Sequence, residues 1–433
     1  MKRPLLGILT CVLIQAVGAQ ATFHGDNART GVYPGSGPVQ PAVVKWRFKT
    51  GGAVVSSPAV AEGVVYVGSA DGNLYAIDQE TGTQKWKFET GEPVVSSPEV
   101  ANGLVHFLGS DGALYAVATA TGTPKWRFAT GGEHRFEAKN LHGMTPAAET
   151  MPDPMDHFLS SPAIANGVVY FGSSDGKVYA VDALSGVLQW SFATGDVVHA
   201  SPSIANNTVY IGSWDSYFYA LDAQTGQEKW RFKAGDDPAI HNQVGFQSSA
   251  AVVGGTVYVG CRDGHAYALD AATGRKLWDY STSQSWVNST PAVRDGVVYV
   301  GTADTHRFHA IDAKTGRLRF LVDVQALIFG SAAVAGNLAY IGTMDGRLSA
   351  IDLTSGKLAW EFRTEASTAD SLKLLSATGG FDRGAMRPVF HNFMDMTVNL
   401  ARMYSVGAIL SSPTIDHGVL FVGSADGFLY ALR

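Results

Sequence analysis

Five side chains capable of specific chemistry stand where the rest of the chain repeatedly places small or apolar residues. They are His199, Trp214, Gln247, Arg262 and Asn288. An indole ring can stack on a planar ligand, a guanidinium can pair with a carboxylate, and amides and imidazoles can orient a bound molecule by hydrogen bonds. We expect them to form a ligand-facing arc. The alternative is that His199 satisfies a buried loop and Arg262 pairs with an aspartate of a neighbouring repeat.

A unit of about 40 residues positions these side chains, and its first full copy spans residues 56–91. We expect strands at 57–61, 64–69, 73–78 and 83–90. Asp71-Gly72 is typical of a tight hairpin turn, because such turns need positive φ angles. Four antiparallel strands repeated at this spacing are typical of a β-propeller blade.

Eight copies of the unit predict an all-β, eight-bladed propeller over residues 43–433, preceded by an N-terminal extension at 22–42. The last copy stops after its third strand, and the unpaired strand at 43–51 can complete it. Pairing the two would close the ring and remove two exposed sheet edges. An aromatic residue recurs once per fourth strand, and such regular use indicates packing between blades. These residues are Trp46, Trp86, Trp126, Trp190, Trp230, Trp278, Phe320 and Trp360.

Strand alternation predicts where the five side chains lie. His199, Gln247 and Asn288 precede the first strands of the fourth, fifth and sixth blades, whereas Trp214 and Arg262 lie in the hairpins between second and third strands. Both positions belong to one face of the ring, at the mouth of its channel. Three insertions enter on that face, and loops on a rigid scaffold are a common way to build a binding site. The insertions are residues 133–158, 236–246 and 366–409, of which the last contains two segments that could form short helices, 369–380 and 389–405.

The repeated motif A-[IVL]-D-x-x-[TS]-G-x-x-x-W resembles the tryptophan-docking repeat of pyrroloquinoline-quinone-like β-propellers. This resemblance implies one of two classes of protein: quinoprotein alcohol dehydrogenases, or non-enzymatic propellers such as the lipoprotein of the outer-membrane β-barrel assembly machinery. In the first class, a quinone (PQQ) and a calcium ion occupy the channel mouth, between a tryptophan floor and a ring formed by adjacent cysteines. Trp214 could then stack on the quinone, Arg262 could pair with its carboxylates, and Asn288 or Gln247 could supply polar contacts.

The sequence departs from the enzyme pattern, because it has no adjacent cysteine pair and no haem-attachment motif. The catalytic carboxylates of the family cannot be matched, and the histidines of the insertions show no metal-type spacing. We therefore expect a binding or scaffold protein with a ligand or partner site at the channel mouth of blades 4–6. A PQQ-dependent dehydrogenase that oxidises an alcohol or sugar is the alternative.

Residues 1–21 resemble a secretory signal peptide, with basic Lys2-Arg3, an apolar run and cleavage after Ala19 or Ala21. We expect a bacterial periplasmic or secreted protein without a membrane span, acting as a monomer. Its partner would be an exported protein or a small molecule. The net charge of −6 disfavours nucleic acid. Only Cys261 would remain after cleavage, as a buried and inert thiol, and no lipid-attachment cysteine is present.

Overall fold

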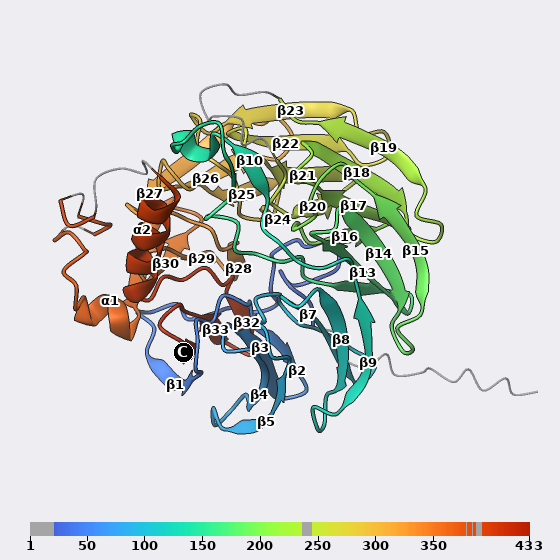
Figure 1. Ribbon diagram of the computed structural model, residues 1–433. Coiled ribbons are helices and arrows are strands. Elements are labelled where there is room, and N and C mark those ends of the chain that lie inside the picture. Colours follow the sequence, from blue (N-terminus) through green and yellow to red (C-terminus); the bar gives the residue numbers. More distant parts are fainter. Residues whose placement is uncertain (1–20, 236–244, 378, 383, 387–391) are drawn as a thin grey trace, which may run out of the picture.

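Eight four-stranded antiparallel sheets surround a central channel in the computed structural model (Figure 1). The structure describes residues 21–235, 245–377, 379–382, 384–386 and 392–433, so the expected signal peptide lies almost wholly outside the described residues. In seven blades the strands follow one another in chain order from the channel to the rim. The predicted all-β, eight-bladed propeller is confirmed.

The first four blades are continuous in sequence except for one insertion before the third. Blade 1 contains β2 (Ala59–Ala61), β3 (Val64–Ser69), β4 (Asn73–Asp78) and β5 (Gln84–Glu89). Blade 2 contains β6 (Glu99–Ala101), β7 (Leu104–Gly109), β8 (Ala113–Ala118) and β9 (Pro124–Ala129). Blade 3 contains β12 (Ala163–Ala165), β13 (Val168–Ser173), β14 (Lys177–Asp182) and β15 (Leu188–Ala193). Blade 4 contains β16 (Ser203–Ala205), β17 (Thr208–Gly212), β18 (Tyr217–Asp222) and β19 (Glu228–Lys233).

The remaining blades repeat this order, and the last one takes its outer strand from the start of the chain. Blade 5 contains β20 (Ala250–Val253), β21 (Thr256–Gly260), β22 (His265–Asp270) and β23 (Lys276–Ser281). Blade 6 contains β24 (Ala292–Arg294), β25 (Val297–Gly301), β26 (Arg307–Asp312) and β27 (Leu318–Asp323). Blade 7 contains β28 (Ala333–Ala335), β29 (Leu338–Gly342), β30 (Arg347–Asp352) and β31 (Lys357–Arg363). Blade 8 contains β32 (Thr414–Asp416), β33 (Val419–Gly423), β34 (Phe428–Leu432) and β1 (Val44–Lys49).

The recurring tryptophans join each blade to its neighbour. The indole N–H of Trp86 donates to the Thr119 carbonyl at 2.8 Å, across the blade boundary. Its ring lies where a side chain on Gly122 would clash, at 2.6 Å from an ideal Cβ. Gly122 has a φ of 69°, so glycine satisfies both the turn and the close approach. The same arrangement recurs around the ring, which supports a packing role for these tryptophans.

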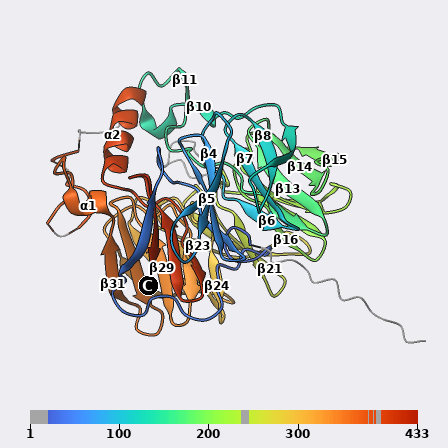
Figure 2. The ribbon, with the colours of Figure 1, turned by 90° about the horizontal axis from the view of Figure 1, so that it is seen from below.

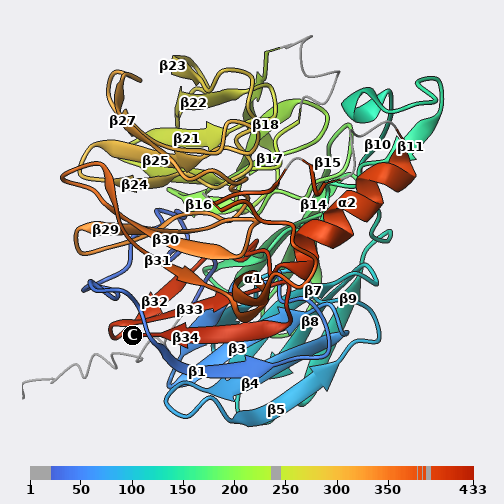
Figure 3. The same cartoon turned by 90° about the vertical axis from the view of Figure 1, so that its left-hand side faces the viewer.

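The ends of the chain close the propeller. Strand β1 pairs antiparallel with β34, with Arg47 opposite Tyr430 and Lys49 opposite Phe428. Val43 and Arg433 extend the pairing through two reciprocal backbone hydrogen bonds of 3.0 Å. Figure 3 shows β1 lying along the outer side of β34. This is the closure that the incomplete last repeat predicts.

The N-terminal extension crosses the end of the channel opposite the predicted mouth. Its backbone carbonyls accept hydrogen bonds from the innermost strands of four consecutive blades, whose donors are Ile204, Val252, Val293 and Val334. Arg29 is fully buried there and donates to the carbonyls of Pro202 (2.7 Å), Pro162 (3.2 Å) and Phe23 (2.6 Å). The extension therefore ties several blades together through backbone contacts.

The insertions build a second layer on the mouth face. Residues 133–158, which we call the lid, contain β10 (Glu137–Lys139), the short 3-10 helix η1 (Leu141–Gly143) and β11 (Thr150–Pro152). Residues 364–409 carry α1 (Glu365–Ala369) and α2 (Phe393–Ser405). Figure 2 shows α2 and the β10–β11 hairpin projecting from the same side of the ring. The insertion expected at 236–246 falls mainly on residues 236–244, which lie outside the described residues.

Of the two segments expected to form helices, one does so. Strand-like apolar spacing gives way to a helical one in α2, where Met396, Leu400 and Met403 are buried on one side. Asn392 caps its first turn by accepting a hydrogen bond from the Asp395 amide at 2.9 Å. In the other segment α1 ends at Ala369, because Asp370 adopts a left-handed conformation with φ of 35°. Among the described residues of 370–380 no helix follows.

Candidate functional site

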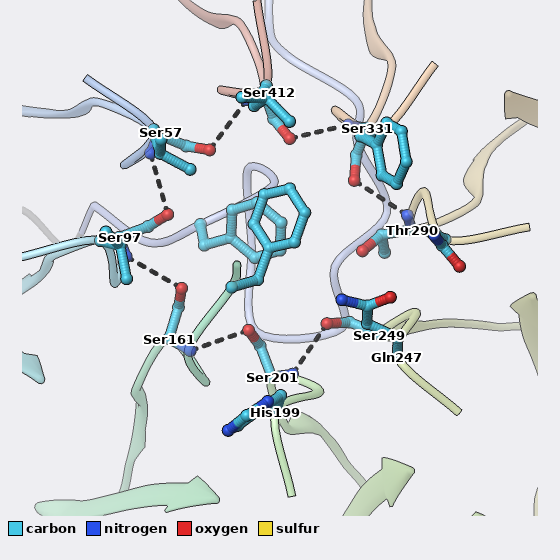
Figure 4. Close-up of a pocket in the computed structure, with 17 residues that line it drawn as sticks. Ser57, Ser97, Ser161, His199, Ser201, Gln247, Ser249, Thr290, Ser331 and Ser412 are labelled. Carbon is cyan, nitrogen blue, oxygen red and sulfur yellow. Dashed lines mark hydrogen bonds between the residues drawn. The ribbon is translucent and has the colours of Figure 1, made fainter. Parts of the chain in front are cut away.

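A ring of hydroxyl side chains narrows the channel at the start of each blade. At seven of the eight blade boundaries, the backbone amide of one ring residue donates to the hydroxyl of the next blade's residue, at 3.0 Å for Ser57 to Ser97 and 2.9 Å for Ser201 to Ser249 (Figure 4). The ring, which we call the serine ring, consists of Ser57, Ser97, Ser161, Ser201, Ser249, Thr290, Ser331 and Ser412. Because each bond crosses a blade boundary, the ring fixes the position of the residues just before it.

Three of the five predicted site residues lie together directly above the serine ring. His199, Gln247 and Asn288 line the channel together with Phe158 of the lid and with apolar residues from other blades, namely Val55, Val95, Phe329 and Leu410. The enclosed space is only about 50 Å³. Both amide atoms of Asn288 and the Gln247 oxygen are buried without a hydrogen-bond partner among the described residues. A polar space of this size can hold a few water molecules.

His199 is held between two carboxylates of the lid. Its Nδ1 lies 2.8 Å from Asp156 Oδ1, and its Nε2 lies 2.6 Å from Ser174 Oγ and 3.7 Å from Glu133 Oε2. Ser174 in turn donates to Glu133. Burial alone would lower the pKa of His199, but Asp156 and Glu133 raise it to about 10. The imidazole is therefore protonated at neutral pH and anchors the lid.

Trp214 lies beneath the lid. Phe136 stacks on its ring with a centroid distance of 4.3 Å and an interplanar angle of 10°. Only 2% of Trp214 is exposed. The hairpin that carries it keeps a positive φ of 72° at Ser216, where most other hairpins have glycine. The aromatic surface predicted to meet a ligand is thus covered by the protein's own insertion.

Arg262 is fully buried between two tryptophans. Its guanidinium carbon lies 4.5 Å from the ring centroid of Trp214 and 3.7 Å from that of Trp286. Nη1 donates to Asp153 Oδ2 at 2.7 Å. Although burial alone would raise the pKa of Asp153, Arg262 and His142 hold it well below its usual range. The expected aspartate partner therefore exists, but the lid supplies it instead of a neighbouring blade.

The lid contacts were beyond the sequence prediction. Phe136, Asp153 and Asp156 lie in an insertion that has no counterpart in the repeated unit, so comparison of the repeats cannot assign a role to them. The sequence offers one signal for these contacts, the acidic residues Asp153 and Asp156 in DPMD, which are suited to pair with the basic side chains of His199 and Arg262. The predicted inert state of Cys261 fits its surroundings, since it is fully buried and burial raises the pKa of its thiol.

Comparison with models of protein families shows the family to which the chain belongs. The family model described as outer membrane protein assembly factor BamB matches residues 43–151, 142–289 and 283–382. The chain belongs to this BamB family. No curated protein matches the chain.

Solved structures show the same fold as this BamB-family chain at low sequence identity. BamB from Moraxella catarrhalis is 16% identical with a TM-score of 0.64, covering 90% of this chain and 97% of that one. The quinohemoprotein alcohol dehydrogenase from Comamonas testosteroni is 15% identical with a TM-score of 0.67, covering 95% and 80%. A europium-containing methanol dehydrogenase is 16% identical with a TM-score of 0.66, covering 94% and 96%. At this identity the likeness shows the fold alone.

The channel mouth of the BamB-family chain does not fit a quinone and its calcium ion. The candidate stacking residue, Trp214, already packs on Phe136, and the candidate carboxylate partner, Arg262, is paired with Asp153. The space above the serine ring, about 50 Å³, is far below the roughly 300–1,000 Å³ of a typical small-molecule site. Within the described part of the chain, no group of three or more His, Cys, Asp or Glu side chains could hold a metal ion.

Proposed function

We propose that the chain is an exported, non-catalytic propeller that binds another exported protein through the lid, over the channel mouth of blades 4–6. The observation that carries the proposal is that the lid supplies partners for Trp214, Arg262 and His199. These three side chains, which distinguish blades 4 and 5 from the other blades, therefore hold the lid in place on the mouth face. Membership of the BamB family supports the same class of function.

The outer part of the lid offers an accessible contact surface. Residues 145–150 are exposed at its tip, and so are Glu137 and Lys139 on β10. Strand β10 pairs with β11 in a sheet of two strands, so each strand has an outer edge. An extended segment of a partner can add to such an edge through backbone hydrogen bonds. Within the described residues, no helix is long and apolar enough to cross a membrane.

Site-specific photo-cross-linking in the native cell envelope tests the proposal. A cross-linker replacing Glu149 at the lid tip should yield a discrete adduct with an exported protein. A matched cross-linker replacing Leu184 is the control, because Leu184 is 66% exposed in a turn that lies on the opposite face. Equal labelling from both positions, or no adduct from Glu149, would contradict a partner site on the lid.

A cofactor titration tests the alternative of a quinoprotein dehydrogenase. PQQ and Ca²⁺ should leave the absorbance spectrum and the melting temperature unchanged, because Phe136 and Asp153 occupy the two groups that a quinone would need. Trp214→Ala is measured in parallel. Tight binding to the unmodified chain that is lost in Trp214→Ala would instead favour the dehydrogenase.

A further inference from the structure

A second cavity, larger than the channel mouth, lies under the lid beside blades 1–3. Its volume is about 360 Å³, within the range of small-molecule sites. Apolar residues at the starts of blades 1–3 supply much of its wall, including Val55, Pro93, Val95 and Leu159, and the lid supplies polar and charged residues. Tyr404 of α2 lines it from the other insertion. The cavity is therefore built by two insertions and the mouth face together.

Three buried polar atoms belong to residues that line this cavity and have no hydrogen-bond partner among the described residues. They are Glu133 Oε1, His157 Nε2 and the Tyr404 hydroxyl. A buried polar atom without a partner costs free energy, about 1–3 kcal/mol for a neutral group and more for a charged one. A native cavity with three such atoms is thus suited to a ligand that supplies the missing partners.

Glu133 supplies the acceptor that a ligand's donor group would meet. Its other carboxylate oxygen, Oε2, accepts from Ser174 and lies 3.7 Å from His199 Nε2. Asp156 also lies against His199, at 2.8 Å from Nδ1. His199 thus lies against both carboxylates, and Oε1 of Glu133 remains an acceptor without a partner among the described residues.

The other two groups are neutral. Burial lowers the pKa of His157 to about 4, so its ring is uncharged at neutral pH. Burial raises the pKa of Tyr404, so its hydroxyl keeps its proton. Both can donate or accept a hydrogen bond without changing the charge balance. Arg135, whose side chain lines the cavity, is exposed.

We propose that this cavity binds a small molecule with a protonated amino group and an apolar body, the amino group donating to Glu133 Oε1 and the body packing on Val95 and Leu159. The site is separate from the partner surface proposed for the lid tip. It adjoins the channel mouth, with which it shares Val55, Val95 and His199, but it does not include Gln247 or Asn288. Free amines and amino acids share this chemistry, and the exposed Arg135 is placed to favour a ligand that also has a carboxylate.

Isothermal titration of the mature chain with three matched probes tests the proposal. The probes are 2-phenylethylamine, which has only the amino group, phenylalanine, which has both charged groups, and 3-phenylpropionate, which has only the carboxylate. At least one of the two amino compounds should bind at least tenfold more tightly than 3-phenylpropionate. Tighter binding of phenylalanine than of 2-phenylethylamine, reduced by Arg135→Gln, would identify the amino-acid form. Binding of 3-phenylpropionate as tight as that of both amino compounds, or no binding of any probe, would overturn the proposal.

Two variants assign the binding to this cavity. Glu133→Gln should weaken the preferred amino probe at least tenfold, whereas Glu89→Gln, an exposed change on β5, should leave it unchanged. Because Glu133 also contacts Ser174, Ala70→Leu provides an independent variant that fills the cavity from blade 1. It should weaken the amino probe similarly while the melting temperature stays near that of the unmodified chain.

Unchanged affinity in both Glu133→Gln and Ala70→Leu would place the binding elsewhere and overturn the proposal. Cross-linking from Glu149 is independent of these titrations, so the two proposals can fail separately.

Discussion

At the scale of single residues, the chemistry that looks functional in the sequence is directed inward. Arg262 is fully buried, and only Nη1 of its guanidinium has a hydrogen-bond partner among the described residues, in Asp153. The faces of two tryptophans supply the rest of its stabilisation. An isolated buried charge is costly, so Arg262 and the two tryptophans around it depend on Asp153 of the lid.

Replacing that acidic residue should therefore strongly destabilise the protein. Asp153→Asn removes the charge opposite Arg262, and we expect it to lower the free energy of unfolding by about 3–5 kcal/mol. Urea denaturation measures the change. Asp295→Asn is the matched control, because Asp295 pairs with Arg294 at the surface with 83% of its side chain exposed, and such a pair contributes about 0–1 kcal/mol. Equal losses in the two variants would contradict the role assigned to Asp153.

His199 should make the stability depend on pH. The carboxylates around it raise its pKa to about 10 in the folded chain, whereas an unfolded histidine has a pKa of about 6.5. Its stabilising effect is complete below about pH 6.5 and is lost as the pH rises towards 10, because the folded chain then binds more protons than the unfolded one. The free energy of unfolding should fall between pH 7 and pH 9 in the unmodified chain. In His199→Gln the decline should be smaller, and an identical decline would show that His199 does not cause it.

At the scale of elements, the N-terminal extension is a structural part of the propeller that the repeat pattern does not contain. Arg29 donates to the carbonyls of Pro202 and Pro162 in two different blades and to Phe23 within the extension. Its side chain also stacks on the Phe23 ring at 5.0 Å. The extension thereby holds blades 3 and 4 at a fixed distance across the far end of the channel.

Arg29→Met should weaken this link, because it leaves the carbonyls without their charged donor while it keeps most of the side-chain volume. We expect the free energy of unfolding to fall by about 2–4 kcal/mol, since each buried acceptor left unpaired costs about 1–3 kcal/mol. Differential scanning calorimetry measures the shift. Arg47→Met on the exposed side of β1 provides a control with the same change of side chain. A melting temperature as high for Arg29→Met as for Arg47→Met would show that the extension contributes little.

Repetition explains how far the sequence could predict these elements. The eight blades and the ring closure follow from a motif that recurs, so each copy supports the others. The lid occurs once, and its partners Phe136, Asp153 and Asp156 lie 43–109 residues from the side chains they contact. No local spacing encodes such contacts. The five arc residues can be found in the sequence because they depart from the repeat. The lid residues that cover three of them can be identified only from the structure. Ligand binding by the arc stays a prediction.

At the scale of the whole molecule, the ring depends on one noncovalent closure. Strand β1 is the outer strand of blade 8, and within the described sheet its backbone pairs with β34 alone, while Trp46 also contacts Phe421 of β33. Trp46 of β1 also docks on blade 1, where its indole N–H donates to the Gln79 carbonyl at 2.9 Å. Loss of β1 would therefore expose the edge of β34 and remove an interblade contact at once.

Replacing residues 43–50 with a Gly-Ser linker of the same length tests this closure while it keeps the N-terminal extension attached. We expect a large fall in the melting temperature and a lower urea midpoint, because the pairing with β34 and the burial of Trp46 are both lost. A synthetic peptide of residues 43–50 should restore part of the loss by rebinding to the free edge of β34. A peptide with Trp46 replaced by serine is the control and should restore less, since it can pair but cannot dock on blade 1. An unchanged melting temperature in the linker variant would show that β1 does not hold the ring closed.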